Sequence, residues 1–490
     1  MRAAYDAATV RAAEAPLLAA LPEGALMQRA AAALARRCAA LLDHVYGSRV
    51  VVLAGPGGNG GDALYAGARL AKRGARVDAL LLSESVLEPA LTALRDAGGR
   101  ARSAGTDTDL ALLAAADLVV DGMLGIGAIG ALRAPMARLA DALVSGPATV
   151  VAVDVPSGVD ASTGEIAGTA VRADVTVTFG ALKFGLVVSP GAACAGQVEL
   201  IDIGLSLPDA GATLLDAADV AAMLPEPRAE SDKYRRGVVG IAAGSDTYTG
   251  AAQLAVGGAL GLGVGMVRYA GVTHPTELVR QRWPEAVVTD VAPGDGAAVL
   301  AAGQVQAWVV GSGLGTDAAA GSVIEAVLGA EVPVLIDADA ITWLADHRDV
   351  LRDRRAPTVL TPHSGEFARL MGVDRDEVDA HRLAEVRAAA ADLGVTVLLK
   401  GSTTVVASPS GQVRINSAAT PYLATAGSGD VLSGVCGALL AAGLEPLDAA
   451  SAGAFLHGLA GLLAAGSPAA SITAMDIVDR LPDAVRAVRA

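Results

Sequence analysis

The 490-residue sequence has few cysteines, and those present are isolated from one another. Cys38, Cys194 and Cys436 lie far apart and form no C-x-x-C pair. This pattern supports neither a disulfide framework nor a thiolate metal site. We therefore expect buried thiols in a cytoplasmic protein.

Lysine and asparagine are also scarce. Only four lysines and two asparagines occur, whereas arginine is used almost everywhere. A pressure toward Ala, Arg and Gly has replaced these residues wherever replacement was harmless, so those that remain are candidates for function. They are Lys72, Lys183, Lys233, Lys400, Asn59 and Asn416.

Basic residues are fewer than acidic residues, 37 against 52. The formal net charge of −15 disfavours binding to nucleic acid phosphates or anionic lipid. Charged residues interrupt the alanines before Pro16, so no secretory signal is expected. Two nearly uncharged stretches, Thr247–Val267 and Ala449–Met475, contain glycines or a Ser-Pro break and are interpreted as buried helices. We expect small-molecule substrates, no nucleic acid and no membrane.

The length and the hydrophobic content predict more than one domain. A chain of 490 residues with 53% hydrophobic and 18% charged residues exceeds what one core usually organises. Short β-branched runs alternate with Ala/Leu-rich segments, which indicates the α/β class with parallel sheets. The expected strands are Arg49–Ala54, Val77–Leu82, Leu118–Asp121, Thr149–Asp154, Asp174–Phe179 and Gln197–Ile203, then Val238–Ala242, Ala307–Val310, Val332–Asp337, Thr358–Leu360, Val395–Leu399 and Thr404–Ala407.

A stretch rich in Pro and Gly, Leu205–Arg228, separates the two series of strands. A run of residues that interrupt helices and strands is typical of a junction between independently folded units. We place the boundary near Gly211, which predicts domains of residues 1–211 and 212–490.

Three loops that follow strands of the first half have unusual compositions: Gly55–Asp62, Gly122–Gly127 and Val155–Asp160. Ligands of open α/β sheets bind at the carboxyl ends of strands, where these loops lie. The glycines of the first loop suit an anion at a helix start, although a plain tight turn explains them equally well. Asp121 and Asp154 each close a strand, and a buried carboxylate needs a cation or hydrogen-bond donors. Together the loops favour a binding site.

The same loops contain hard oxygen ligands. Asn59, Asp121 and Ser157 offer the donors that an alkali or alkaline-earth cation prefers, and no His or Cys competes nearby. The alternative is that each side chain caps its own turn.

These motifs carry a family resemblance. Residues 1 to about 211 resemble the epimerase domain that interconverts the R and S forms of hydrated NADH and NADPH, a Rossmann-like fold. The family pattern is Asn-Asn-Gly-Gly-Asp, then Asp with a Gly-rich loop, then Asp-x-Pro-Ser-Gly. The resemblance implies potassium on Asn59, Asp121 and Ser157, and Asp154 as the acid/base, with Lys183 matching a family lysine. The implied hydrate-binding residues are Gly58, Asn59, Gly60, Gly61, Asp62, Gly125, Ile126, Gly127, Ala128, Ile129, Gly130, Ala131 and Asp154. Gly58 replaces the family's first Asn, which removes a side-chain contact with the hydrate.

The second half has its most specific motif at Thr425–Gly434, where Gly427-Ser428-Gly429 precedes Asp430 and an apolar helix. Glycines there let backbone amides face a phosphate, and the acid can take a hydroxyl proton. The alternative is that Asp430 caps the helix. The motif resembles the anion hole and base of ribokinase-like enzymes. Lys400–Thr404, at the end of a strand, supports this interpretation.

The loop Thr361–Glu366 indicates which branch of the ribokinase-like enzymes the second half resembles, because His363 stands where related kinases have Asn. With Lys233–Gly237, Tyr248–Ala252 and Gly311–Gly315, it resembles the ADP-dependent dehydratase of hydrated NAD(P)H over residues 212–490. The resemblance implies hydrate contacts at Ala252, Gly313, His363 and Asp430, and nucleotide contacts at Lys400, Gly401, Ser402, Thr403, Thr404 and Gly429. It implies ADP as co-substrate with magnesium, and a water-mediated contact to the metal from Glu366. Ser312 replaces a frequent family Pro, a change expected to be mild.

The resemblances together imply a bifunctional repair enzyme for NADHX and NADPHX, the hydrated cofactors, built as two three-layer α/β/α domains. We expect a homo-oligomer. Two alternatives stay open at this point. The second half could be a true small-molecule kinase regulated by the first, or the first half could be a binding module without activity, as Gly58 would permit.

Overall fold

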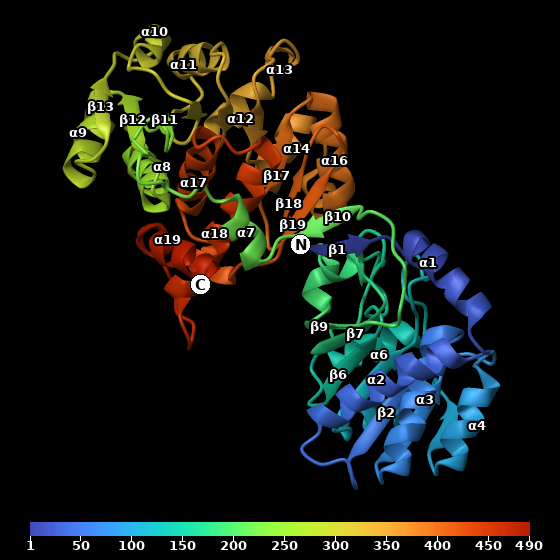
Figure 1. Cartoon of the computed structure of the whole chain (residues 1–490). Helices are drawn as coiled ribbons and strands as arrows, with labels where there is room; N and C mark the ends of the chain where they lie inside the picture. The colour runs from blue at the N-terminus through green and yellow to red at the C-terminus, as the bar shows by residue number, and fades with distance from the viewer. The chain divides into compact units, whose positions relative to one another are not determined.

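The computed structural model describes residues 1–490, which divide into two compact units (Figure 1). The first unit is Ala3–Gly211, and the second comprises Ala212–Ala490 together with Met1 and Arg2. The stretch interpreted as a junction is partly ordered secondary structure. It contains strand β10 (Ala212–Leu214) and helix α7 (Ala217–Met223), whose first turn is closed by a capping box between Asp216 and Asp219.

The first unit contains a seven-stranded sheet in the order β4-β3-β2-β5-β6-β7-β9. Every pairing in it is parallel. The strands are β2 (Arg49–Ala54), β3 (Arg76–Leu81), β4 (Arg100–Ser103), β5 (Leu118–Gly122), β6 (Thr149–Val153), β7 (Val175–Phe179) and β9 (Gln197–Ile201). The order reverses direction between β2 and β5, so a crevice opens at their carboxyl ends.

Side chains of alternate residues cover the two faces of this sheet. Val50 and Val52 of β2 share a core with helices α2 (Ala25–Leu41), α3 (Gly58–Lys72) and α4 (Glu88–Asp96). Val51 and Leu53 pack in a separate core with α5 (Asp107–Ala114) and α6 (Met136–Leu143). The unit is therefore three-layered, because successive side chains of a strand point to opposite faces.

The second unit contains a larger sheet in the order β13-β12-β11-β14-β15-β16-β17-β18-β19-β10. Its strands are β11 (Val238–Ala242), β12 (Met266–Gly271), β13 (Val287–Asp290), β14 (Ala307–Val310), β15 (Val334–Ile336), β16 (Thr358–Leu360), β17 (Thr396–Leu399), β18 (Thr404–Ala407) and β19 (Val413–Asn416). The strands from β13 to β17 run parallel, and β18 is antiparallel to both of its neighbours. The order reverses between β11 and β14, which places a second crevice there.

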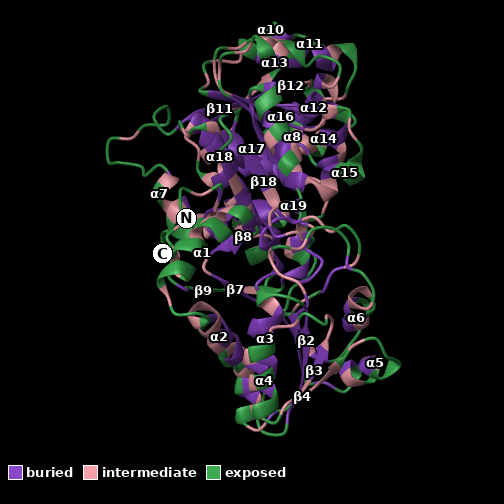
Figure 2. Ribbon diagram, turned by 90° about the vertical axis from the view of Figure 1, so that its right-hand side faces the viewer, coloured by how far each residue is buried: buried purple, intermediate pink, exposed green.

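One face of the second sheet is covered by the apolar helices α8 (Thr249–Leu262), α17 (Ser428–Ala441) and α18 (Pro446–Ala465), and Figure 2 shows α17 and α18 as largely buried. The amphipathic helix α19 (Ala474–Arg489) packs against α8 and α18. Helix α18 is the one helix long and apolar enough to cross a membrane, but 67% of its apolar window is buried inside the protein. It packs as a core helix, as predicted.

Most expected strands are present with bounds shifted by no more than two residues. The prediction missed several others. They are β1 (Arg2–Tyr5), β4, β8 (Leu182–Lys183), β10, β12, β13 and β19. Most of these are four residues or fewer, or lie toward a sheet edge, where the apolar signal of a buried strand is weak.

Candidate functional sites

A cavity of about 600 Å³ lies in the first unit at the reversal between β2 and β5. Helix α1 (Ala7–Ala20) lines one side, and the loops after β2, β5 and β6 line the rest. The predicted residues that line it are Gly58, Asn59, Asp62, Gly125, Ile126, Gly127, Ala128 and Asp154. Leu18, Met27 and Phe179 add an apolar wall. The cavity therefore joins the polar residues of all three predicted loops.

The remaining predicted residues of these loops do not line the cavity. Gly60 is buried beneath it, and a Cβ there would stand 2.1 Å from the Gly55 carbonyl oxygen, so this position requires glycine. Gly61 is likewise buried. Ile129 is 89% exposed, and neither Gly130 nor Ala131 is part of the lining.

Asp154 occupies a constrained position at the base of the cavity. Its φ of 67° is in the left-handed region, which non-glycine residues rarely adopt outside functional or tightly determined positions. Its Oδ1 accepts hydrogen bonds from Lys183 Nζ at 2.5 Å, the Thr178 hydroxyl at 2.9 Å and the Phe179 amide at 3.1 Å. Lys183 is 1% exposed and also donates to the Phe179 carbonyl. Lys183 thus holds the Asp154 carboxylate in a fixed orientation within a buried ion pair.

The three residues proposed to hold a cation meet behind the cavity. Asp121 is fully buried and accepts hydrogen bonds from the Ser157 hydroxyl at 2.7 Å and the Ser157 amide at 2.8 Å. The Asn59 amide donates to the Leu124 carbonyl at 3.0 Å, and the Ser157 hydroxyl lies 3.4 Å from that same oxygen. A carboxylate, a hydroxyl and a carbonyl oxygen thus converge, and the Asn59 amide group lies beside them with its N–H groups directed at the Leu124 and Val153 carbonyls. This donor set fits a hard monovalent cation.

The second unit places a buried carboxylate, Asp337, at the carboxyl end of β15. Lys400 Nζ lies 2.8 Å from its Oδ1. The hydroxyls of Thr361 and Ser433 donate to it at 2.9 and 2.7 Å. The pKa of Asp337 is lowered, because Lys400 and these hydroxyls outweigh the effect of burial.

Sequence analysis did not propose Asp337 as a site residue. A signal was available, because Asp337 closes a predicted strand just as Asp121 and Asp154 do. The next residue, Ala338, has a φ of 52°, so both units carry a left-handed non-glycine residue at their central carboxylate.

Asp430 lies in the first turn of α17, and the structure excludes its role as the helix cap. The cap position belongs to Gly427, with φ of 85°, and Asp430 is the third residue of the helix. Burial and the negative charge of Asp337 raise the pKa of Asp430 to about 6, against the opposing effects of the Ser312 hydroxyl and Lys400. A carboxylate with a pKa near 6 is a competent base at neutral pH.

His363 caps helix α14 (Ser364–Met371). Its Nδ1 accepts from the amides of Gly365 and Glu366 at 3.0 and 3.1 Å, and the Glu366 carboxylate accepts from the His363 amide at 2.8 Å. The ring is 60% exposed, and its Nε2 lies 3.4 Å from Glu366 Oε1. His363 therefore combines the structural role with an accessible ring. The Glu366 carboxylate is held by this cap and lies 3.8 Å from Lys400 Nζ.

The other predicted residues of the second unit differ in burial and in position. Ala252 is fully buried in the core, so its side chain offers no surface for the predicted contact with the hydrate. Gly313, with φ of 67°, is half-buried at the β11/β14 reversal. Lys400 approaches the first turn of α17, since a Cβ on Gly429 would stand 3.3 Å from its Nζ. Of the remaining nucleotide-site residues, Gly401 and Ser402 are exposed, Thr404 is half-buried and Thr403 is buried.

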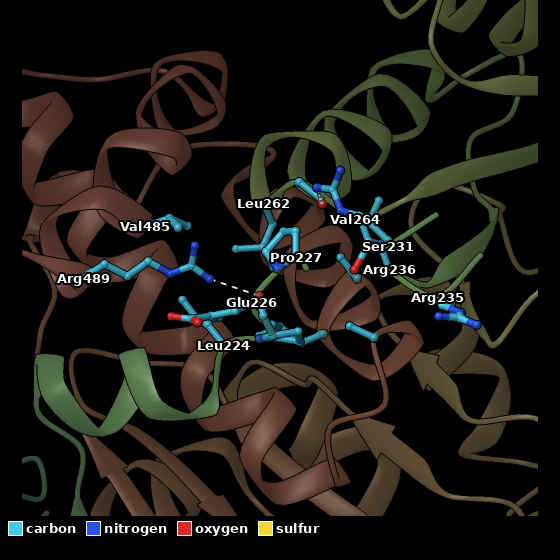
Figure 3. Close-up of a pocket in the computed structure, with 15 residues that line it drawn as sticks. Leu224, Glu226, Pro227, Ser231, Arg235, Arg236, Leu262, Val264, Val485 and Arg489 are labelled. Atoms are coloured by element: carbon cyan, nitrogen blue, oxygen red, sulfur yellow. Dashed lines mark hydrogen bonds between the residues drawn. The ribbon is translucent and has the colours of Figure 1, made fainter. Parts of the chain in front are cut away.

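A separate cavity of about 130 Å³ lies at the opposite end of α17, near Ala438 and Ala442 (Figure 3). The segment Leu224–Pro227 covers it, and Arg489 Nη2 donates to the Pro225 carbonyl at 3.1 Å. None of the predicted site residues lines it. Arg489, at the end of α19, holds the segment Leu224–Pro227 in place over this cavity. We therefore assign the cavity a structural role.

Comparison with known proteins matches both units. The family model described as YjeF-related protein N-terminus matches residues 23–185, and that described as NAD(P)H-hydrate dehydratase matches residues 239–483. The bifunctional NAD(P)H-hydrate repair enzyme Nnr of Mycobacterium tuberculosis is 48% identical over 456 residues, covering 92% of this chain and 92% of that protein. The enzyme of the same name from Mycobacterium leprae is 48% identical over 473 residues, covering 96% and 95%.

Solved structures resemble the second unit. The ADP/ATP-dependent NAD(P)H-hydrate dehydratase from Bacillus subtilis, co-crystallised with ATP/Mg²⁺, is 30% identical with a TM-score of 0.52, covering 56% of this chain and 97% of that chain. A ribokinase-like superfamily protein from Enterococcus faecalis is 24% identical with a TM-score of 0.52, covering 58% and 98%. The second unit therefore has the ribokinase-like fold.

Proposed function

The chain belongs to the family of bifunctional NAD(P)H-hydrate repair enzymes, and on that premise we propose that its two units divide the repair between them. Ala3–Gly211 interconverts the R and S hydrates, and Ala212–Ala490 returns the S hydrate to NAD(P)H at the expense of ADP. The observation that supports this division most directly is that each unit has its own carboxylate, Asp154 or Asp430, at the carboxyl end of its own sheet.

For epimerisation, the cavity of the first unit holds the hydrated nicotinamide ring. Asp154 moves a proton at the ring while Lys183 holds its carboxylate in place. The loop residues Asn59 and Gly125–Ala128 contact the rest of the substrate. Potassium, held by Asn59, Asp121 and Ser157, supplies a fixed positive charge beside these loops.

For dehydration, the ring hydroxyl is a poor leaving group and is first converted into a good one. Asp430 takes the hydroxyl proton, and the oxygen attacks the terminal phosphoryl group of ADP, so that AMP leaves. Loss of the resulting phosphate with a proton from the neighbouring ring carbon then restores the double bond. The amides of the first turn of α17 face the transferred charge. Lys400, held by Asp337, lies beside them.

Several finer properties are part of the same proposal. Lys400–Thr404 and Gly429 hold the nucleotide, and Gly313 and His363 contact the hydrate. Magnesium accompanies the nucleotide phosphates, as ATP/Mg²⁺ does in the Bacillus subtilis relative. Phosphate oxygens and water would supply most of its ligands, because Mg²⁺ prefers hard oxygen donors. We further propose that the protein is cytoplasmic and forms a homo-oligomer.

Separate assay of the two units tests this function. A fragment of residues 1–211 should interconvert pure R and S hydrates without nucleotide, and a fragment of residues 212–490 should convert only the S hydrate to NAD(P)H, and only with ADP. Chromatography of the two epimers and the absorbance of reduced nicotinamide measure these reactions. The full chain is the control, since it should do both. An epimerase activity in residues 212–490, or dehydration without nucleotide, would contradict the division.

Gly58→Asn should increase the affinity of the epimerase for its hydrate. Gly58 is exposed, and a Cβ there would meet nothing within 4 Å, so the family side chain fits without rearrangement. One regained hydrogen bond contributes about 1 kcal/mol, roughly a fivefold decrease in KM. Steady-state epimerisation measures this, with Gly146→Asn, an exposed glycine outside the cavity where a Cβ makes only ordinary contacts, as the control. An unchanged KM would mean that the first loop does not contact the hydrate.

A further inference from the structure

The first unit contains an acidic side chain that lacks a hydrogen-bond partner. Asp62, in the second turn of α3, is 9% exposed, and its Oδ1 is buried without any partner. A buried carboxylate normally accepts several hydrogen bonds or pairs with a cation. By contrast, Asp121 and Asp154 in the same unit each accept three. The isolation of Asp62 therefore calls for an explanation.

The position of Asp62 points to the substrate. It lines the 600 Å³ cavity together with Asp154, and so faces the same bound ring. The other charged groups around the cavity are Glu14 and Arg11 of α1, and Lys183 beneath Asp154. No cation contacts Asp62, because Lys183 is bound to Asp154.

The electrostatic surroundings of Asp62 differ from those of Asp154, whose carboxylate is paired with Lys183. Burial, with the negative charges of Asp154 and Glu14, raises the pKa of Asp62 well above its usual value. A protonated carboxyl is the form that tolerates a buried site without donors. Two nearby carboxyl groups with different environments are the usual arrangement of an acid and a base.

We propose that Asp62 is the second proton-transfer group of the epimerisation, acting as the acid while Asp154 acts as the base. This inference rests on the epimerase function proposed above and names the residue that completes it. Each carboxyl group handles one of the two proton transfers that inversion at the hydroxyl-bearing carbon requires.

The hydroxyl-bearing carbon is bonded to the ring nitrogen, and this bond makes its inversion possible. The C–O bond breaks with its electron pair on oxygen, Asp62 donates its proton, and water leaves. The lone pair of the nitrogen meanwhile forms a C=N double bond. Water then adds to the other face, gives a proton to Asp154, and the π electrons return to nitrogen. One proton has moved from Asp62 to Asp154, and the reverse reaction uses the two residues in exchanged roles.

Asp62→Asn tests the proposal in the full chain. The amide has nearly the same shape and cannot donate a carboxylic proton, so epimerisation should fall by about 10²- to 10⁴-fold. The wild-type rate should decline with rising pH as Asp62 loses its proton, and this decline should disappear in the variant. The melting temperature should stay equal or rise, because a buried carboxyl without a partner is removed. Exposed Asp96→Asn is the matched control and should retain the wild-type rate and profile.

The outcomes separate this inference from the proposed function. If the wild type epimerises and Asp62→Asn keeps its rate and its decline with rising pH, Asp62 is not the acid. A reduced rate with an unchanged decline with rising pH would equally overturn the proposal, because it would make Asp62 a residue of substrate positioning only. Absence of epimerisation in the wild type would instead refute the function of the first unit.

Discussion

Replacing Asp430 by Asn should slow ADP-dependent dehydration by about 10²- to 10⁴-fold, the usual cost of losing a general base. The structure makes this a clean test, because Asp430 is not the helix cap and the Asn side chain removes no capping hydrogen bond. A charge near a helix N-terminus contributes only about 0.3–1 kcal/mol, so the variant should unfold at nearly the wild-type temperature. The absorbance of reduced nicotinamide from pure S hydrate and ADP measures the loss.

The pH dependence gives the same prediction an independent readout. Since the pKa of Asp430 is raised to about 6, the base form predominates above that pH. In the wild type, kcat/KM for dehydration should therefore rise with pH through about 6 and then level off. Asp430→Asn should lose this rise.

Two controls accompany the Asp430 variant. Asp392→Asn, an exposed residue of α16 (Arg382–Leu393), should retain the wild-type rate. Epimerisation should be unaffected in both variants. Near-normal dehydration by Asp430→Asn would disprove the phosphoryl-transfer mechanism.

Asp154→Asn should abolish epimerisation, with a loss of about 10²-fold or more, and leave dehydration intact. The Asn side chain keeps an oxygen for the Thr178 hydroxyl and the Phe179 amide but lacks the charge that takes up a proton. Chromatographic separation of the R and S hydrates after incubation without nucleotide measures this. A variant that still epimerises would limit Asp154 to holding its loop.

Stability must be followed in this experiment, because the substitution leaves buried Lys183 without its carboxylate. Breaking a buried pair in this way costs about 3–5 kcal/mol in known cases. The double variant Asp154→Asn/Lys183→Met removes both charges and should recover much of that loss. If the double variant folds and remains inactive, the loss reflects catalysis. If it folds and epimerises, neither member of the pair is needed for the reaction.

Many residues of the candidate sites could be predicted, because they lie in short segments with distinctive sequence motifs. Loops rich in Gly and Asp after β-branched runs located the ends of the strands, and the cavity was found where three of those loops meet. Local sequence does not reveal burial, however. Ala252 belongs to one of the predicted motifs, and only the structure shows that its side chain is buried in the core.

The sequence by itself determined the α/β class, the boundary region near Gly211, the family and the two carboxylates expected to carry the chemistry. These follow from local patterns of glycine, β-branched residues and strand-ending acids. Only the tertiary structure decided which charges meet, because strand order brings together residues distant in the chain. Lys400 reaches Asp337, 63 positions earlier, and Lys183 reaches Asp154 from 29 positions later. With both lysines engaged, Asp62 has no cation and Asp430 has a negative neighbour. Burial and the position of counter-charges set protonation, and both depend on packing.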